Sequence, residues 1–387
     1  MSNADLVAEE ASIVHLVVEC PVRLTPRVMQ VRGMFDLAPA KTSRVEWDVD
    51  LPLGAKEWHI GLIVGPSGSG KSTVARHLFA EPLAAAERLP PWPGDAAIVD
   101  GFPEGMPIKQ VVALLSSVGF SSPPAWLRPY HVLSAGEQFR AGLARLLAYA
   151  PEVAVIDEYT SMVDRTVARI GSAALAKTVR RLGRRFVAVT CHEDVEAWLQ
   201  PDWTYRPATN TFLWRCLQRR PPIRLRVYRC RLEAWQLFRQ HHYLSSEVSP
   251  SAVAFLAEWQ ARPVAFSAWI NSLTKHGGKR EHRTVTLPDY QGVGIGHALS
   301  NFCAGLWKAL GQRVASTTSH PAFIAARLRS ADWRLIRSPA LAKRPGRRHQ
   351  GVRHACTRLT AGFEYVGPGI ERRLAEQMVE SKVKSQK

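Results

Sequence analysis

The stretch GPSGSGKST, residues 65–73, constrains this chain more than any other part of it. It directly follows the apolar run HIGLIV (59–64) and fits the pattern GxxxxGK[ST]. Glycines in such a turn let backbone N–H groups approach a phosphate, and the N-terminus of the following helix adds a positive dipole. A strand before the turn and a helix after it are the required context, and the sequence predicts both. We therefore expect a nucleotide-binding loop in an α/β domain.

Residue types in this loop have separate roles in binding ATP. Lys71 is expected to reach the β- and γ-phosphates, and Ser72 to ligate Mg²⁺ at the start of the helix. The other contacts with the nucleotide are expected from Gly65, Ser67, Gly68, Gly70 and Thr73. The alternative is a glycine loop without a ligand, which the predicted strand and helix disfavour.

Two later strands end in residues suited to ATP hydrolysis. VAVIDE (153–158) is an apolar strand that ends in two acids. Asp157 would hold Mg²⁺ through water, and Glu158 would polarise the attacking water. RFVAVT (185–190) is followed by His192, which could touch the γ-phosphate. The alternatives are a solvated acidic turn and a structural histidine.

A third stretch, HVLSAGEQFR (131–140), is a Ser-Gly turn that opens a helix. Its exposed N–H groups, with Ser134 and Gly136, could bind a γ-phosphate presented by another subunit. Taken alone, it could be an ordinary helix cap. We also expect a strand at AAIVD (96–100) and a loop at SSPPAW (121–126). The alternation of strands and helices predicts a largely parallel sheet.

In this order, residues 14–200 closely resemble the ABC ATPase superfamily. By this resemblance, Gly65–Thr73 is Walker A, Leu133–Gln138 is the signature motif and Val153–Glu158 is Walker B. Ser161–Asp164 is the D-loop, and His192 is the switch histidine. It places an adenine-stacking aromatic at Phe35, ahead of a predicted strand pair, VEWDVDLPLG (45–54). Two positions depart from the family: Ala135 replaces a glycine of the signature motif, and Asp100 or its neighbours replace the Q-loop glutamine.

The family completes its ATP sites in trans, with the signature motif of one subunit facing the P-loop of another. Because this chain holds one copy of each, the resemblance implies a head-to-tail homodimer through the ABC domains. ATP with Mg²⁺ would then act as a clamp that hydrolysis releases.

The second half of the chain holds another glycine turn between a strand and a helix. In TVTLPDYQGVGIGHALSNFCAGLWKAL (284–310), Gln291, Gly294 and Gly296 lie at the turn, where N–H groups could approach an anion. RVASTTS (313–319) is predicted as the next strand, and HPAFIAARLRSADWRLI (320–336) as a helix that leads into another strand. The alternative is a plain strand–helix joint.

This ordered set resembles the GNAT acyltransferase superfamily over about residues 225–370. The resemblance implies an α+β fold and acetyl-CoA, or another acyl-CoA, as cofactor. Its binding would involve Val285, Gln291, Gly292, Gly294 and Gly296. In many members a tyrosine protonates the departing thiolate, and Arg329 stands nearest to that position here. The candidates for a general base are Glu258, Glu281 and Asp289.

HHYLS (241–245) follows a predicted helix, RLEAWQLFRQ (231–240). His241, His242 and Tyr243 could bind or activate a substrate, because imidazole and phenol groups carry protons. The alternative is a capping turn with one buried histidine and a core tyrosine. A metal site that includes Cys230, His354 or Cys356 is disfavoured, because no pair has zinc spacing.

Positive charge is concentrated in the second half. Residues 1–220 carry 24 Lys and Arg against 23 Asp and Glu, whereas residues 221–387 carry 27 against 10. Such a field is typical of a protein whose partner is a polyanion, and we favour DNA over RNA. The segment LAKRPGRRHQGVRH (341–354) is predicted to be an exposed basic loop. Side chains that could stack an extruded base, or pack in the core, are Trp235, Phe238, Tyr243 and Trp333.

We expect an α/β P-loop ABC ATPase domain (1–218), a linker (RRPPIR, 219–224), an α+β GNAT-like domain (225–370) and a basic tail (371–387). The six cysteines include no CxxC pair, which suits a reducing cytoplasm. No apolar run approaches the roughly 20 residues that span a bilayer, so no membrane partner is predicted.

Four functions remain open. The first is an ATP-gated acyltransferase that modifies a nucleic-acid base, since HHYL and PDYQGVGIG resemble the phage-encoded Mom-type enzymes that alter adenine in DNA. The second is a DNA-associated ABC ATPase of the repair or chromosome type, whose GNAT-like module only binds. The third is the nucleotide-binding subunit of a transporter. The fourth is an ATP-gated small-molecule or protein N-acetyltransferase.

Overall fold

The computed structural model describes residues 14–38, 42–150, 152–215, 220–243, 247–272, 277–341 and 359–380. They fall into two compact units. The first unit lies within residues 1–88, 150–161 and 179–219, and the second within residues 89–149, 162–178 and 220–387. Helices from the first half of the chain therefore belong to the same unit as the second half. The domain boundaries assigned from the sequence stay predictions.

A five-stranded sheet forms the centre of the first unit, in the order β4-β5-β3-β6-β7. The first four of these strands are parallel, and β7 is antiparallel to β6. Their bounds are β3 (Ile60–Val64), β4 (Val153–Ile156), β5 (Arg185–Thr190), β6 (Trp203–Arg206) and β7 (Thr211–Trp214). Every residue of β3 is buried, as expected for a central parallel strand. The strands predicted at HIGLIV, VAVIDE and RFVAVT are confirmed.

Helices of the first unit follow these strands. They are α2 (Lys71–Leu78), α3 (Ala80–Glu87), η3 (Glu193–Val195), α8 (Glu196–Leu199) and η4 (Pro207–Thr209). The helix predicted after the glycine loop is α2, so the strand–turn–helix context of that loop is confirmed. The core of this unit contains large buried side chains, among them Trp58 before β3, Phe79 after α2, and Trp203 and Tyr205 of β6.

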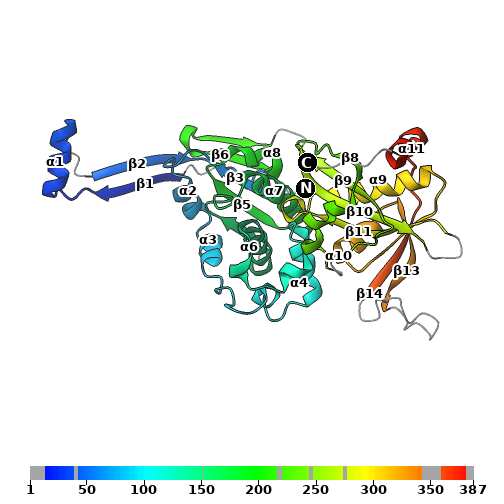
Figure 1. Cartoon of the computed structure of the whole chain (residues 1–387). Coiled ribbons are helices and arrows are strands. Elements are labelled where there is room, and N and C mark those ends of the chain that lie inside the picture. The colour runs from blue at the N-terminus through cyan, green and yellow to red at the C-terminus, as the bar shows by residue number, and fades with distance from the viewer. Residues whose placement is uncertain are drawn as a thin grey trace, which may run out of the picture. The chain divides into compact units, whose positions relative to one another are not determined.

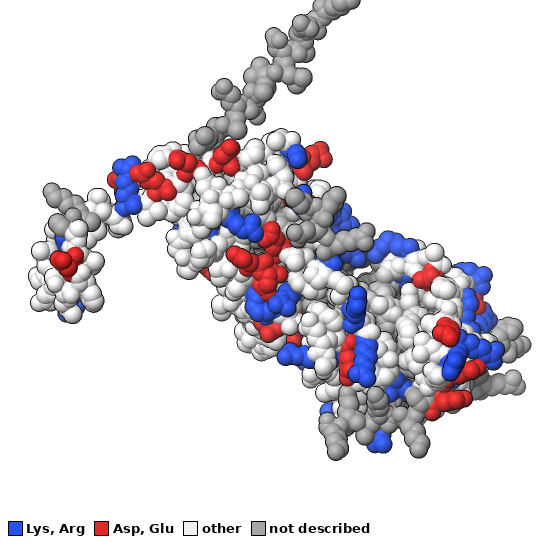
Figure 2. Space-filling view, turned by 90° about the horizontal axis from the view of Figure 1, so that it is seen from above, with Lys and Arg blue, Asp and Glu red and all other residues white. Residues whose placement is uncertain are grey.

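A separate two-stranded ribbon belongs to the same unit. β1 (Val14–Pro21) pairs antiparallel with β2 (Thr42–Val49), and α1 (Pro26–Phe35) lies at the end of the ribbon (Figure 1). Charges of both signs lie next to one another on it (Figure 2), and Arg44 pairs with Glu19 at 3.1 Å. The strand pair predicted within residues 45–54 is wrong. The first part of that stretch is β2, and its partner is β1 from before α1.

Several helices of the second unit come from the first half of the chain, and two of them correct predictions made from the sequence. They are η1 (Ile98–Gly101), α4 (Ile108–Ser117), α5 (Pro123–Trp126), η2 (Tyr130–Val132), α6 (Ala135–Tyr149) and most of α7 (Arg165–Leu182). AAIVD is not a strand: the N–H of Asp100 donates to the carbonyl of Ala97, which closes a 3₁₀ turn. SSPPAW is not only a loop, since both prolines occupy the first turn of α5, where a missing N–H costs nothing.

A seven-stranded sheet forms the rest of the second unit, in the order β13-β14-β12-β11-β10-β9-β8. All neighbours are antiparallel except β11 and β12, which are parallel and pair only through Lys279–Val314 and Arg280–Ala315. Beyond these two pairs the strands separate. The bounds are β8 (Arg226–Cys230), β9 (Val253–Trp259), β10 (Arg262–Asn271), β11 (Lys279–Thr286), β12 (Val314–Thr318), β13 (Trp333–Leu341) and β14 (Leu359–Tyr365).

The helices connected to this sheet are η5 (Leu232–Leu237), η6 (Arg239–His241), η7 (Pro288–Tyr290), α9 (Ile295–Ala309), α10 (Pro321–Leu328) and α11 (Arg372–Glu380). The predicted order of strand, turn, helix, strand, helix and strand over residues 284–336 is confirmed. The helix predicted at RLEAWQLFRQ is two 3₁₀ segments instead. Trp235 and Phe238 are both buried, and their spacing of three residues fits a 3₁₀ turn.

No helix among the described residues is long and apolar enough to cross a membrane.

Candidate functional site

The glycine loop of residues 65–70 connects β3 to α2. Gly68 (φ +79°) and Gly70 (φ +88°) have left-handed backbones, which only glycine adopts without strain. Lys71 begins α2 and is 8% exposed, and its Nζ donates to the carbonyl of Pro66 at 2.7 Å. Its ammonium group is thus folded back over the loop, where phosphate oxygens are expected, and Ser72 lies in the first turn of α2.

An aromatic side chain that the sequence did not single out contacts this loop. Trp47 of β2 donates from Nε1 to the carbonyl of Ser69 at 3.2 Å, and a Cβ added to Gly70 would lie 2.4 Å from its indole ring. Phe35, the predicted adenine-stacking residue, lies at the end of α1 and is 67% exposed. The sequence feature that could have indicated this contact is the place of Trp47 in a predicted strand ahead of the glycine loop.

The two predicted hydrolytic residues follow adjacent strands. Glu158 follows β4 with φ +55°, a strained backbone for a non-glycine residue, and its Oε2 accepts from Ser161 Oγ at 2.7 Å. The N–H of Glu158 donates to Asp157 Oδ1 at 2.9 Å. His192 follows β5, and its N–H donates to Thr190 Oγ1 at 3.1 Å. The same hydroxyl donates to the carbonyl of Tyr159 at 2.7 Å, so the two loops are tied together.

These three loops share one edge of the sheet. β3, β5 and β4 are parallel neighbours, and the glycine loop, His192 and the Asp157–Glu158 pair each follow a carboxyl end. In open parallel sheets this is the edge at which ligands bind. The tertiary structure therefore brings together the P-loop, the acids and the histidine.

The Ser-Gly turn begins α6 with reciprocal capping. Ser134 N–H and Oγ both donate to Glu137 Oε2 at 3.0 Å, and the N–H of Glu137 donates back to Ser134 Oγ at 3.3 Å. Gly136 packs closely: an added Cβ would lie 3.3 Å from Val167 and from the carboxylate of Asp289. The ordinary-cap interpretation and the phosphate-site interpretation are both compatible with this geometry.

The glycine turn after β11 is buried at Gln291 and exposed at Gly294. Gln291 is 8% exposed: its Oε1 accepts from Ser121 N at 2.7 Å, and its Nε2 donates to Ser122 Oγ at 3.2 Å and to the carbonyl of Thr286 at 2.8 Å. A Cβ on Gly292 would lie 2.7 Å from Gly119 Cα. The Gln291 amide is thus fully occupied within the chain.

The remaining predicted cofactor residues of this turn differ in accessibility. Gly294 (φ +95°) caps α9, is exposed, and has open space where a Cβ would stand. Gly296 packs against Thr286 and Phe323, and Val285 is buried in the core. The N-terminus of α9 around Gly294 is therefore the part of the turn that an anion can approach.

The predicted HHY residues reach the end of β12. His242 is buried and stacks on Tyr243 with ring centroids 4.8 Å apart, and the Tyr243 hydroxyl accepts from Ser319 N at 3.4 Å. The ring of His320 lies 6.0 Å from that of Tyr243, and its Nε2 is 3.0 Å from the carbonyl of Ser121. Burial lowers the pKa of His320. This group lies where β11 and β12 have separated.

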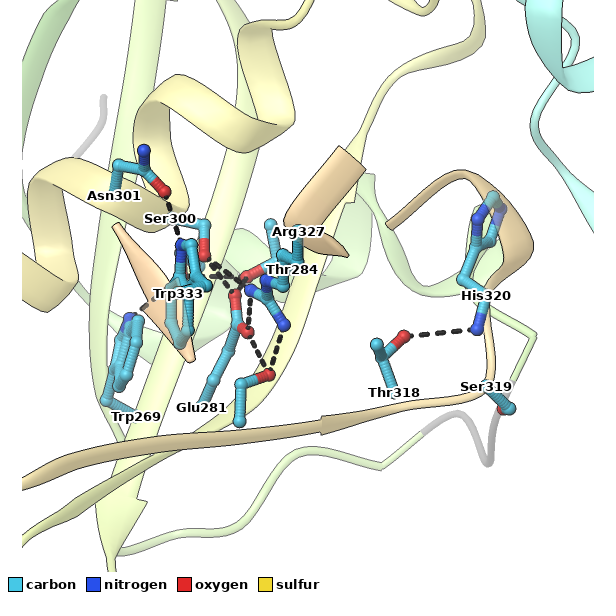
Figure 3. Close-up of polar contacts among 12 residues, drawn as sticks. Trp269, Glu281, Thr284, Ser300, Asn301, Thr318, Ser319, His320, Arg327 and Trp333 are labelled. Carbon is cyan, nitrogen blue, oxygen red and sulfur yellow. Dashed lines mark hydrogen bonds and ion pairs between the residues drawn. The ribbon is translucent and has the colours of Figure 1, made fainter. Parts of the chain in front are cut away.

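One of the three candidate bases is fully occupied. Glu281 lies 2.6 Å from Arg327 Nη2 and accepts from the hydroxyls of Thr284, Ser300 and Ser316 (Figure 3). Burial alone would raise the pKa of Glu281, but Arg327 and the hydroxyl donors lower it to about 2. A carboxylate held ionised in this way is a poor proton acceptor, so Glu281 does not suit a general base.

The other two candidates have separate partners. Glu258 accepts from Tyr228 at 2.5 Å between β8 and β9, and Asp289 lies beside α6. Of the side chains considered for base stacking, Trp235, Phe238 and Trp333 are buried in the core. No cluster of three metal-ligating side chains occurs among the described residues. His354, Cys356 and most of the basic segment 341–354 lie outside the part of the chain that the structure describes.

Comparisons with curated proteins match the first part of the chain. An import ATP-binding protein for 2-aminoethylphosphonate from Salmonella choleraesuis is 29% identical over 167 residues, 35% of this chain and 45% of the relative. A cytochrome c biogenesis ATP-binding export protein from Rhodospirillum rubrum is 32% identical over 162 residues, 35% of this chain and 68% of the relative. An Fe(3+) import ATP-binding protein from Streptomyces coelicolor is 29% identical, over 40% of this chain and 52% of the relative.

This chain thus spans less than half of the first of these relatives and about two thirds of the second. Among solved structures, cbiO1 from Clostridium perfringens is 18% identical over 42% of this chain and 77% of that chain, with a TM-score of 0.33. A dimeric ATP-binding cassette with ADP and phosphate bound is 19% identical over 42% of this chain and 86% of that chain, also at 0.33. No protein-family model matches the chain.

Proposed function

The chain belongs, over about the first 40% of its length, to the ABC ATPase family, and from this premise we propose that it is an ATP-gated acyltransferase that modifies nucleic acid. ATP and Mg²⁺ are the ligands expected for this family. We assign phosphate binding to the loop 65–73, Mg²⁺ to Ser72 and Asp157, and hydrolysis to Glu158 and His192. The shared edge of β3, β5 and β4 carries this assignment.

The ATP sites of this proposal are completed between two copies of the chain. The chain has one P-loop and one signature motif (Leu133–Gln138), and this motif lies at the N-terminus of α6, where the helix dipole favours an anionic oxygen. A closed pair with two-fold symmetry uses both elements of both copies. Binding of ATP would hold the pair together, and hydrolysis would release it.

The acyltransferase part of the proposal is supported by the separation of β11 and β12. β11 and β12 pair through only two residue pairs, so the later residues of the two parallel strands do not pair with each other in the middle of the sheet. An extended amide-containing ligand, such as the pantetheine arm of an acyl-CoA, can pair with strand backbone at such a separation. The turn at Gly294 and the start of α9 follow β11 directly and could receive the diphosphate.

Nucleic acid is proposed as the acyl acceptor on grounds of charge. Residues 221–387 carry 27 Lys and Arg against 10 Asp and Glu. This imbalance attracts a polyanion and repels cationic substrates such as lysine-rich tails. Tyr243 and His242 are the proposed proton-carrying groups, because the Tyr243 hydroxyl accepts from Ser319 N directly after β12 and His242 stacks on Tyr243.

A second candidate function is a GNAT-like module that binds nucleic acid without catalysis. The occupied Gln291 amide favours it, and so does Glu281, whose carboxylate is held by Arg327. The relatives named above are import and export proteins, so a transporter subunit is a third candidate, which a membrane partner recovered with the protein would favour.

The test uses the full chain with duplex DNA, Mg-ATP and acetyl-CoA, followed by mass spectrometry of the released nucleosides. We expect one nucleoside to gain the mass of an acyl group. Lys71→Ala should abolish the product, because loss of charge-assisted contacts with the phosphates weakens ATP binding by about 100-fold. Lys109→Ala, an exposed lysine of α4, is the matched control and should retain it.

The outcomes separate the candidates. A product on RNA alone would keep the acyltransferase and change its substrate. Unmodified DNA and RNA, together with nucleic-acid binding that persists, would support the non-catalytic module. A product that Lys71→Ala forms at the wild-type rate would refute ATP gating.

A further inference from the structure

The loop that follows β11 contacts the start of α6, where the signature motif (Leu133–Gln138) lies; we call this start the signature turn. Both segments belong to the second unit. Asp289 of η7 lies against Gly136: a Cβ on that glycine would stand 3.3 Å from Asp289 Oδ1. Gly136 is the second residue of α6, so a carboxylate from the second half of the chain lies beside the N-terminus of the signature helix.

Arg140, one turn further along α6, makes the second contact with Asp289. Its side chain is completely buried, and its Nη1 lies 3.8 Å from Asp289 Oδ1 and 3.4 Å from the carbonyl of Gly136. Its Nε and Nη2 have no hydrogen-bond partner among the residues that the structure describes. Burial lowers the pKa of Arg140 to about 10, and Asp289 and Glu137 oppose that shift. A buried cation with so few partners depends strongly on each nearby anion.

The residues that follow Asp289 in this loop pack against the turn between α4 and α5 and against α7. Gln291 bonds to Ser121 and Ser122, and Gly292 packs on Gly119 and Ala174 with no room for a methyl group. Both Gly119 (φ +88°) and Gly292 (φ +91°) have left-handed backbones. Asp289 is therefore presented to α6 from a loop whose position is closely determined, rather than from a free surface segment.

We propose that Asp289 is a positioning residue of the ATP site, which through Gly136 and Arg140 sets the signature turn that receives the γ-phosphate. This inference rests on the proposed completion of the ATP site in trans. It makes the second half of the chain part of the nucleotide switch, because the residue that adjusts the signature turn lies between β11 and α9.

Because Asp289 is negatively charged, its positioning role predicts the direction in which the KM for ATP changes when the charge is removed. A γ-phosphate bound at the N-terminus of α6 would lie near the carboxylate of Asp289, which stands beside Gly136, and near Glu137, which caps that positive end. Asp289→Asn removes the repulsion from Asp289, so the KM for ATP should fall by about fivefold at low ionic strength. The kcat should also fall, because Arg140 loses its carboxylate and the signature turn is held less well. Salt should reduce the KM difference, since it screens the repulsion.

The experiment measures steady-state ATPase activity of the full chain at about 0.05 M and about 1 M salt. The variants are Asp289→Asn, Asp289→Glu and, as a matched control, Glu380→Gln, an exposed carboxylate of α11. Asp289→Glu keeps the charge and should keep a KM near that of the wild type, and Glu380→Gln should match the wild type in both constants. The side chain of Asp289 is 53% exposed, and Glu137 remains as a second anion near Arg140, so we expect the variants to fold.

The results that would overturn the inference differ from those that would overturn the proposed function. An Asp289→Asn protein with wild-type KM and kcat, or with a raised KM that ignores salt, would exclude the positioning role while the ATPase remains. A wild-type protein that neither pairs nor hydrolyses ATP would remove the trans site, and this inference with it.

Discussion

At the scale of single residues, the buried pair of Glu281 and Arg327 explains why Glu281 does not suit the role of general base. The two side chains are 7% and 1% exposed, and the guanidinium also lies 4.0 Å from the ring of Trp333. Glu281 Oε1 accepts from the hydroxyls of Thr284 and Ser300, and Oε2 accepts from the hydroxyl of Ser316 and from Arg327 (Figure 3). From the sequence alone, Glu281 was an equal candidate for a general base. Its role in the folded chain is to join β11 to α10.

Replacement of this carboxylate tests that role. Glu281→Gln should lower the free energy of unfolding by about 3–5 kcal/mol near neutral pH, because it leaves Arg327 buried without its counter-ion. The folded-state pKa of about 2 lies below the ordinary value of 4.5. The stabilisation is therefore fully present above about pH 4.5 and is lost as the pH falls toward 2.

Urea unfolding of wild type and variant at several pH values measures this difference. We expect it to be constant above about pH 5 and to shrink below. Glu371→Gln, an exposed carboxylate before α11, serves as control and should change little. A difference that is the same at acidic and neutral pH would mean that the charge of Glu281 contributes nothing.

At the scale of elements, two glycines determine how the turn after β11 packs. Gly292 and Gly294 have nearly the same backbone angle, but a Cβ on Gly292 would overlap Gly119 and Ala174, whereas Gly294 faces open space. The sequence places both glycines in one cofactor motif. The structure separates them into a packing contact with the α4–α5 turn and a free helix N-terminus.

This contrast gives a paired prediction. Gly294→Ala should cost about 1 kcal/mol, the strain of a left-handed alanine. Gly292→Ala should cost about 2–4 kcal/mol, because overlap with packed backbone adds to the same strain. Chemical denaturation of the two variants against wild type measures both values. Equal losses would show that the contact with Gly119 contributes no stability.

Patterns in the sequence predicted elements best where apolar residues form a continuous run next to a clear turn or helix signal. The strands at residues 59–64, 153–158 and 185–190 and the helices after both glycine turns were predicted correctly. AAIVD and RLEAWQLFRQ were not, because 3₁₀ turns bury side chains at a spacing of three that resembles part of a helix or strand pattern. The partner of β2 lies before α1, and such pairing over a long loop leaves no local signal.

At the scale of the whole molecule, the proposed switch requires two copies of the chain. Glu158 is the residue whose loss should stop hydrolysis without preventing ATP binding, since we propose that it polarises the attacking water. Its backbone is strained at φ +55°, and Ser161 holds its carboxylate, as expected for a positioned catalytic group.

Glu158→Gln should therefore trap a homodimer in the presence of Mg-ATP. Size-exclusion chromatography with light scattering should find twice the chain mass of 43.0 kDa with ATP and the single mass without it. Lys71→Ala in the same background should remain single under both conditions, because the P-loop no longer holds ATP. A variant that binds ATP but stays monomeric would contradict completion of the site in trans.

Residue types along the chain were enough to identify the nucleotide loop, the acids and the histidine after neighbouring strands, and the concentration of positive charge after residue 220. Each depends on local residue types: glycines for a tight turn, a strand before it, and a count of charges. The folded chain was needed to show that Trp47 contacts the loop, that Glu281 is paired with Arg327, and that Asp289 lies against Gly136. These contacts join residues far apart in the chain, and they depend on close packing, which a pattern of residue types does not specify.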